Sequence, residues 1–220
     1  MTAWQLYDIS RTIAPSLAVW PGDVPYSYQH ALRKRDGASV NLTTLTLSAH
    51  TGSHADAPYH YRDADAHPAD LPLDPYVGPA HVVTIARRAG GILPADLAAH
   101  DLTGLQRLLI HTWVSDLPDD RWPEDFPHPT PELVDWLAAR GAVLLGLDCP
   151  SVDRFDSQDL PCHHRLRAQG IATLETLVLA GVPDGLYELI ALPLKLAGAC
   201  GSPVRAVLRT IAPAATGGPA

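Results

Sequence analysis

The chain has 220 residues, 46% of them hydrophobic, which is enough for one domain with a sizeable core and too little for two ordinary ones. Charged residues make up only 18%, below the roughly 25% usual in soluble domains, which suggests that a second copy of the chain covers part of the surface. The net charge of −8 argues against nucleic acid or an anionic membrane as a partner, because either would require a basic face.

The lack of a recognisable targeting signal and the use of cysteine predict a cytoplasmic protein. No stretch approaches the eighteen or so uninterrupted apolar residues of a membrane span, and residues 1–8 lack the basic start of a signal peptide. The three cysteines, Cys149, Cys162 and Cys200, are far apart and form no Cys-x-x-Cys motif. We therefore expect a reduced, cytoplasmic chain in which any metal site is built from nitrogen and oxygen ligands.

Short strands dominate the predicted elements. Alternation of apolar residues, β-branched content or short apolar runs predict strands at Trp4–Ile13, Val40–Ala49, His81–Arg87, Arg107–Thr112, Ala142–Leu147, Leu186–Leu192 and Pro203–Leu208. Between them lie a turn at Ala18–Asp23 and a long proline-rich loop over residues 60–79. Thr130 and Pro131 begin a helix that Gly141 closes, and a second helix is expected at Leu174–Leu179.

This mixture of elements predicts the α/β class. Strands outnumber helices, which favours a mixed or barrel-like sheet over a doubly wound parallel one. No internal repeat or long linker divides the chain, so residues 1–220 are expected to form a single domain.

A histidine cluster follows the strand predicted at Val40–Ala49. In the segment S-A-H-T-G-S-H-A-D-A-P-Y-H, His54 and Asp56 project from one side of an extended chain, and a turn at Gly52 could fold His50 beside them. Two imidazoles and a carboxylate make a zinc-type site with room for water, which the metal would activate. His60, which follows a proline, is placed to move protons rather than to bind metal.

Two further features are ambiguous on spacing alone. Cys162-His163-His164-Arg165 and the later Glu175 could complete a two-metal site, but an exposed histidine pair and an ordinary helical glutamate are the simpler interpretation. Trp20, in V-W-P-G-D, fits a core anchor and an aromatic wall for a flat ligand equally well.

The motif H-T-G-S-H-A-D-A-P-Y-H resembles the H-T-G-T-H-x-D-x-P-x-H signature of the metal-dependent cyclase-like hydrolases. Outer motifs extend the resemblance over nearly the whole chain and are similar to those of the bacterial kynurenine formamidases. They are V-W-P-G-D, L-L-G-L-D-C-P-S-V-D, H-H-R, Y-E-L-I-A-L-P-L-K-L and S-P-V-R-A-V-L.

The resemblance implies a swivelling β/β/α fold with a central barrel-like sheet, a homodimer, and hydrolysis of N-formyl-L-kynurenine to L-kynurenine and formate. It implies two zinc ions per subunit, held by His50, His54, Asp56, His163 and Glu175, with both carboxylates bridging. His60 would be the general acid/base and Trp20 a substrate contact, while a one-residue slip would exchange His163 for His164. The alternative function is amide or lactam ring opening of the isatin hydrolase type on the same metal site.

Overall fold

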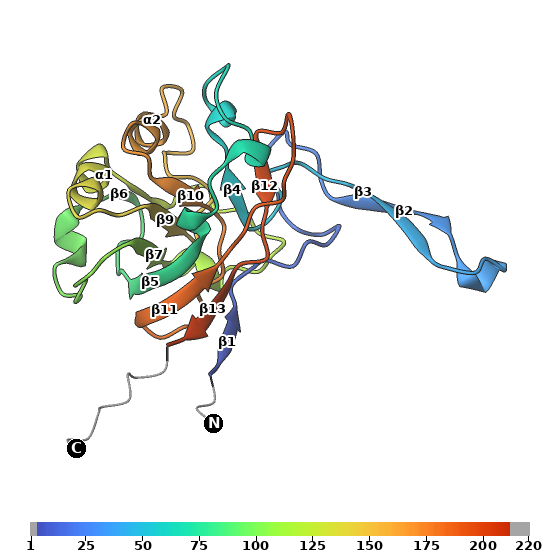
Figure 1. The fold of residues 1–220 in the computed structure, drawn as a ribbon, viewed down its shortest axis with the longest axis horizontal. Helices are drawn as coiled ribbons and strands as arrows, with labels where there is room; N and C mark the ends of the chain where they lie inside the picture. Colours follow the sequence, from blue (N-terminus) through green and yellow to red (C-terminus); the bar gives the residue numbers. More distant parts are fainter. Residues whose placement is uncertain (1–3, 212–220) are drawn as a thin grey trace.

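A curved mixed sheet organises residues 4–211, the part of the chain that the computed structural model describes (Figure 1). Its seven strands lie in the order β1-β13-β11-β5-β7-β9-β10. Their bounds are β1 Leu6–Asp8, β5 Val77–Thr84, β7 Arg107–His111, β9 Leu144–Leu147, β10 Ala172–Leu174, β11 Gly185–Ile190 and β13 Val207–Thr210. Strands β5, β7, β9 and β10 pair in parallel, and the ladders from β5 through β11 and β13 to β1 are antiparallel.

The parallel strands are buried on both faces, as their continuous apolar sequences require. Successive side chains of a strand point to opposite faces, so Leu108 and Leu109 of β7 belong to two different core clusters. The cluster that contains Leu108 also includes residues of the helices α1 (Pro131–Ala138) and α2 (Pro161–Ala168), which pack against each other.

The opposite face of the sheet supports a small two-stranded ladder of β4 (His54–Asp56) and β12 (Gly201–Pro203). Ala55, in the middle of β4, is fully buried in the core cluster on this face. Because side chains alternate along a strand, its neighbours His54 and Asp56 both point away from that core. The hydrophobic effect therefore fixes the strand that presents two of the predicted site residues.

The remaining elements are short. They are β2 Ser27–Leu32, β3 Leu42–Thr46, β6 Gly90–Ile92 and β8 Pro127–Pro129, and the 3-10 turns Lys34–Asp36, Pro58–His60, Pro68–Asp70, Asp74–Tyr76, Pro94–Leu97 and Trp113–Asp116. Among residues 4–211, no helix has the length and apolar character needed to cross a membrane.

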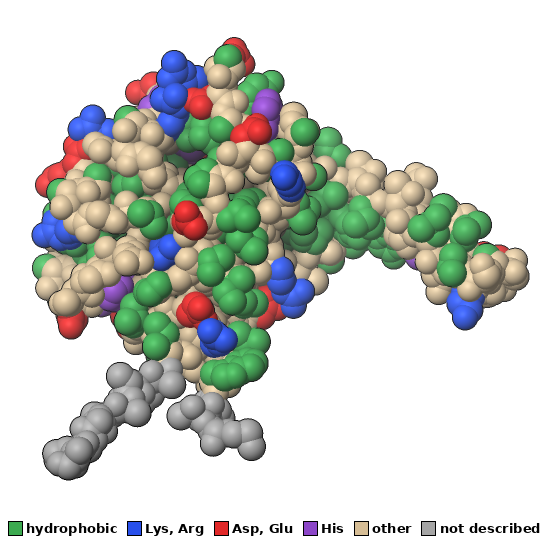
Figure 2. All heavy atoms as spheres, viewed as in Figure 1, with side chains coloured by type: hydrophobic (Ala, Val, Ile, Leu, Met, Phe, Trp, Pro, Cys, Tyr) green, Lys and Arg blue, Asp and Glu red, His purple; other side chains and the backbone are tan. Residues whose placement is uncertain are grey.

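Strands β2 and β3 form an antiparallel hairpin that extends far from the rest of the molecule (Figure 1). We call residues 27–46 the arm. Every residue of its two strands is exposed, including the large apolar side chains of Tyr28, Leu32, Leu42 and Leu45. Hydrophobic side chains lie along its surface (Figure 2).

The structure confirms the α/β class and the mixed, barrel-like sheet with flanking helices. Helix α1 begins after Thr130, whose hydroxyl accepts a hydrogen bond from the Leu133 backbone N–H, as predicted. The predicted domain limits, residues 1–220, include residues 1–3 and 212–220, which lie outside the described part.

Two predicted elements are wrong. Leu174–Leu179 is not a helix: β10 ends at Leu174, and the following segment is held by backbone bonds to other strands, such as that of Leu177 N–H to Leu147 O at 3.0 Å. Residues 203–208 are not one strand, because β12 ends at Pro203 and β13 begins at Val207.

Candidate active site

Three imidazoles and two carboxylates from three separate stretches of the chain converge beside β4. Nδ1 of His50 lies 3.0 Å from Oδ1 of Asp56, and Nε2 of His54 lies 3.4 Å from that same oxygen. From the other side, Nε2 of His163 lies 3.5 Å from Oδ2 of Asp56. The carboxylate of Glu175 lies 3.4 Å from Nε2 of His54 and 3.8 Å from Nε2 of His163. Asp56 is thus the centre of the cluster.

The turn before β4 places His50. Gly52 has a φ of +67°, a left-handed conformation that a glycine adopts without strain, and it turns the chain between His50 and His54. A Cβ on Gly201 would lie 2.9 Å from Cε1 of His50, so the ring occupies space that only a glycine at 201 leaves.

Helix α2 supplies His163. His163 is buried while the adjacent His164 is exposed, because consecutive helical residues point in different directions. The structure thus brings His163, and not His164, to Asp56. The carboxylate of Asp153 accepts hydrogen bonds from the backbone N–H groups of Cys162 and His163 at the start of α2 and lies 2.7 Å from Nδ1 of His163.

The segment after β10 supplies Glu175. Its backbone N–H and carbonyl exchange hydrogen bonds of 3.0 and 3.2 Å with His54, which fixes the two residues opposite each other. The Val152 N–H donates to Oε1 of Glu175 at 2.9 Å. The next residue, Thr176, has a φ of +53°, an uncommon conformation for a β-branched residue. This turn keeps residues 174–179 out of a helix.

The cluster fits a metal centre. Both carboxylate oxygens of Asp56 are buried, and neither has a partner in hydrogen-bond geometry among residues 4–211, despite the nearby ring nitrogens. Unpartnered buried carboxylate oxygens are costly, and a bound cation would satisfy them. Among residues 4–211, three sets of three residues have ligand atoms close enough to share one ion: His50, His54 and Asp56; Asp56, His60 and His163; and His50, His60 and Cys200. Imidazole and carboxylate donors suit a zinc-type ion.

The electrostatics also depend on Asp56. Burial alone would lower the pKa of the cluster histidines, but contacts with Asp56 and other acceptors outweigh it and raise the pKa of His50 to about 9. The same balance, with Glu175 beside His54 and Asp153 beside His163, raises the pKa of both rings to about 10. Burial and the neighbouring Asp56 raise the pKa of Glu175. Positive charge is therefore strongly favoured at this site.

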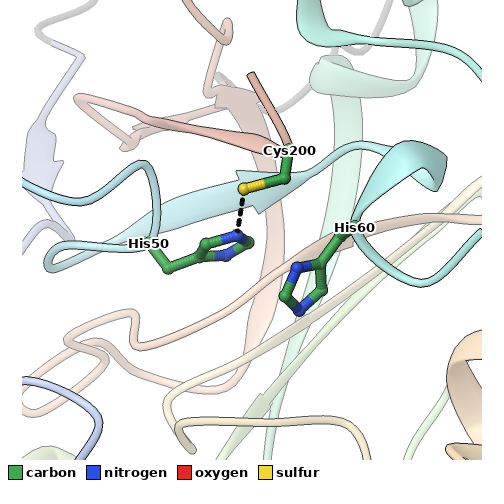
Figure 3. Close-up of side chains that lie close together, drawn as sticks. All are labelled: His50, His60 and Cys200. Atoms are coloured by element: carbon green, nitrogen blue, oxygen red, sulfur yellow. Dashed lines mark hydrogen bonds between the residues drawn. The ribbon is translucent and has the colours of Figure 1, made fainter. Parts of the chain in front are cut away.

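His60 and Cys200 complete the outer side of the cluster (Figure 3). The ring of His60 lies 4.1 Å from that of His50, centroid to centroid. Partial desolvation and the positive charge of the neighbouring imidazoles lower its pKa to about 4, although the residue is exposed on its outer side. Sγ of Cys200 lies 3.1 Å from Nε2 of His50. His60 is thus an uncharged imidazole at neutral pH, available as a base.

Trp20 lies in an aromatic group rather than in the cluster itself. Its ring stacks on Phe155 at a centroid distance of 4.9 Å and meets Trp122 edge to face at 5.7 Å. Trp122 lines a cleft together with His50, which connects the aromatic group to the cluster. The Nε1–H of Trp122 is buried and has no hydrogen-bond partner within the described part of the chain.

Sequence reasoning missed three residues of this site: Asp153, Cys200 and Gly201. Asp153 stands in the motif L-L-G-L-D-C-P-S-V-D, where it could have been recognised as the acidic residue that precedes the histidine pair. Cys200 and Gly201 carried no signal, because only the pairing of β12 with β4 brings them to His50.

Comparison with known proteins agrees with this geometry. The family model described as "Putative cyclase" matches residues 7–154, more than half of the chain. Kynurenine formamidases of Salinibacter ruber and Bacillus cereus are 48% and 43% identical to the chain, and each alignment covers 93% of this chain and 97% of the relative.

Solved structures share the fold. A potential metal-dependent hydrolase with cyclase activity superposes with a TM-score of 0.82 at 25% identity, covering 96% of this chain and all of that one. Isatin hydrolase A of Labrenzia aggregata gives a TM-score of 0.80 at 22% identity and 94% coverage of both chains, which shows the fold alone.

Fold and cluster together define an α/β hydrolase with a histidine and carboxylate cluster that could bind metal. The chain belongs to the cyclase family, and its predicted resemblance to the kynurenine formamidases is confirmed by relatives that match it over almost their whole length.

The histidine pKa values predict opposite effects of pH on the metal-free and the zinc-loaded chain. Without metal, the pKa of His54 and of His163 is about 10 when folded and ordinarily 6.5, so their stabilising contribution is complete below pH 6.5 and is lost as the pH rises toward 10. The free energy of unfolding of the metal-free chain, measured with urea, should fall by at least about 1 kcal/mol between pH 6.5 and 8.

In excess zinc the trend should reverse, because a cation binds only unprotonated imidazoles and stabilises the folded chain more as the pH rises. The same downward slope with and without zinc would contradict a metal site at these histidines.

Proposed function

We propose that this chain hydrolyses N-formyl-L-kynurenine to L-kynurenine and formate in a metal-dependent reaction. The observation that carries the proposal is the buried cluster of three imidazoles and two carboxylates around Asp56, in a chain 48% identical to a kynurenine formamidase. The substrate is a small molecule, and the bond to be cleaved is a formamide on an aromatic ring.

Two zinc ions would be held by the cluster. His50, His54 and Asp56 would bind one ion, while Asp56, His163 and Glu175 would bind the other, so that Asp56 bridges them. The buried, unpartnered oxygens of Asp56 support this assignment. Glu175, whose two oxygens face His54 and His163, would provide the second bridge.

Bound zinc supplies acidified water near neutral pH and polarises a carbonyl oxygen. The chain must supply the proton transfer, because an anilide nitrogen leaves poorly without a proton. His60 is neutral at pH 7 and lies beside His50, so it can accept the proton that water loses and deliver it to the departing nitrogen.

The aromatic group formed by Trp20, Trp122 and Phe155 would hold the substrate ring. Trp20 remains our proposed substrate contact, with the substrate ring taking the place that Phe155 occupies against its face. Stacking of this kind contributes about 1 kcal/mol beyond the burial of the ring.

The direct test uses the zinc-loaded chain with two substrates, N-formyl-L-kynurenine and isatin. We expect formate release from the first to exceed ring opening of the second by a large factor in kcat/KM. Preferential ring opening of isatin would show that the chain is a lactam hydrolase, our alternative function, and not a formamidase. If the protein with its zinc sites fully occupied shows neither activity, it is a metal-binding protein without hydrolase chemistry.

His60→Ala separates proton transfer from metal binding. It should lower kcat by a hundredfold or more, because general acid/base catalysis contributes on that order, while the two zinc ions stay bound. Turnover and metal content measured on the same preparation check this.

Two comparisons make the result specific. His164→Ala, which removes an exposed imidazole of α2, should leave both turnover and metal unchanged. Asp56→Ala should release metal. If His60→Ala also releases metal, His60 is a ligand. Its side chain is close enough to those of Asp56 and His163 to share an ion with them.

A homodimer would explain the arm. An isolated two-stranded hairpin is marginally stable in water, and this one exposes Tyr28, Leu32, Leu42 and Leu45. A second copy of the chain would cover these side chains.

The cysteines of the chain are free, and two of them are buried, which supports a reducing compartment such as the cytoplasm.

Leu42→Asp together with Leu45→Asp should convert the dimer to a monomer, because a buried unpaired carboxylate opposes association strongly. Light scattering after size-exclusion chromatography measures the mass. Gln29→Glu, which adds charge at a polar position of β2, is the control and should stay dimeric. If the parent chain is a monomer, or if the double variant stays dimeric, the arm does not form a dimer interface.

A further inference from the structure

The three histidines of the cluster share one arrangement. In each ring, one nitrogen lies close to a carboxylate of the cluster, and the other nitrogen contacts a hydrogen-bond partner outside the cluster. Nδ1 of His54 lies 2.8 Å from the Gly52 carbonyl oxygen, and Nδ1 of His163 lies 2.7 Å from Asp153. For His50 the outer partner is a sulfur, because Nε2 lies 3.1 Å from Sγ of Cys200 (Figure 3).

His50 depends most on such a partner. Its side chain is 17% exposed, whereas those of His54 and His163 are 4% exposed, so fewer neighbours fix its ring. The inner nitrogen, Nδ1, must be unprotonated to bind a cation. The proton then resides on Nε2, which donates it to the sulfur of Cys200.

The backbone holds Cys200 in register with the cluster. Its carbonyl accepts a hydrogen bond of 3.0 Å from the Ala57 N–H, and the next residue, Gly201, pairs with Asp56 in the β12–β4 ladder. Gly201 also leaves the space in which the His50 ring lies, since a Cβ there would be 3.2 Å from Nδ1. Residues 200–201 thus determine where the ring lies and how it is rotated.

We propose that Cys200 is a positioning residue for the metal centre: its sulfur accepts the Nε2–H of His50 and keeps Nδ1 directed at Asp56. The inference rests on the proposed function in one respect, namely that His50 is a metal ligand. It adds that a thiol determines the affinity of the ion bound by His50, His54 and Asp56, while the ion near His163 and Glu175 is independent of it.

Cys200→Ala tests the proposal by metal affinity. Zinc is titrated into metal-free protein in competition with a chromophoric chelator, which resolves the two sites. We expect the Ala variant to bind one of the two ions about 10–100-fold more weakly, the usual effect of losing an outer partner of a ligating histidine. Affinity for the other ion should not change.

Two variants serve as comparisons. Cys200→Ser keeps a hydrogen-bond acceptor of similar size and should recover most of the lost affinity. Cys162→Ala removes a thiol that is buried in α2 and donates to the Pro129 carbonyl, so it should leave both affinities unchanged. Circular dichroism of each metal-free variant verifies that the fold is retained, and the Ser variant still decides the question if the Ala variant does not fold.

Three results would overturn the inference. Wild-type affinity in Cys200→Ala would show that the sulfur does not position His50. Failure of Cys200→Ser to recover affinity would remove the hydrogen bond as the cause. Sulfur-to-metal charge-transfer absorption in the cobalt-loaded parent, absent in Cys200→Ser, would make Cys200 a ligand. Failure of the proposed function is distinct, because the parent chain itself would then bind no metal or release no formate.

Discussion

The buried carboxylate of Asp56 is the constraint on which the site depends. Its two oxygens are removed from water without hydrogen-bond partners in the described part of the chain, and a second carboxylate, Glu175, is buried nearby. Two adjacent buried anions are tolerated only when positive charge accompanies them. In the metal-free chain that charge comes from protons on imidazoles, which is why the pKa of His54 is raised to about 10. A cation would replace those protons, so metal binding and proton release are the same equilibrium.

The surrounding fold keeps this unfavourable arrangement in place. The buried Ala55 anchors β4 to the sheet, and the exchange of backbone hydrogen bonds with Glu175 ties β4 to the segment after β10. Asp153 has two tasks, because it caps the start of α2 and also holds the ring of His163. Different outer partners therefore support the two halves of the cluster: a carboxylate at His163, and a carbonyl and a thiol at His54 and His50. Since a carboxylate is the strongest acceptor of the three, the two metal positions that we propose would not be equivalent.

The sequence predicts the local part of this site and misses the parts that depend on tertiary structure. His54 and Asp56 share a side because alternation along a strand is a property of the backbone, and the strand-rich α/β class follows from the same patterns. The predicted helix at Leu174–Leu179 is wrong because its buried leucines pack into the sheet core, and nothing local signals the left-handed Thr176. Cys200 was not recognised as a neighbour of His50, because 150 residues separate them and only strand pairing joins them. The first strand of the arm, β2, was not predicted, because its sequence S-Y-Q-H-A-L lacks the β-branched residues that indicate β3.

A fold by itself does not determine which amide a protein cleaves. This chain shares its fold with isatin hydrolase A of Labrenzia aggregata, so any selectivity must come from local features. The aromatic group is built from two separate segments: Trp20 comes from the turn before the arm, and Phe155 comes from the loop that carries Asp153 toward α2. Asp153, two residues before Phe155, caps α2 and contacts the ring of His163. A ligand that displaced Phe155 from Trp20 would therefore pull on the segment that positions His163. In the proposed function, substrate binding and the alignment of the metal ligands would thus be linked through one short segment of the chain.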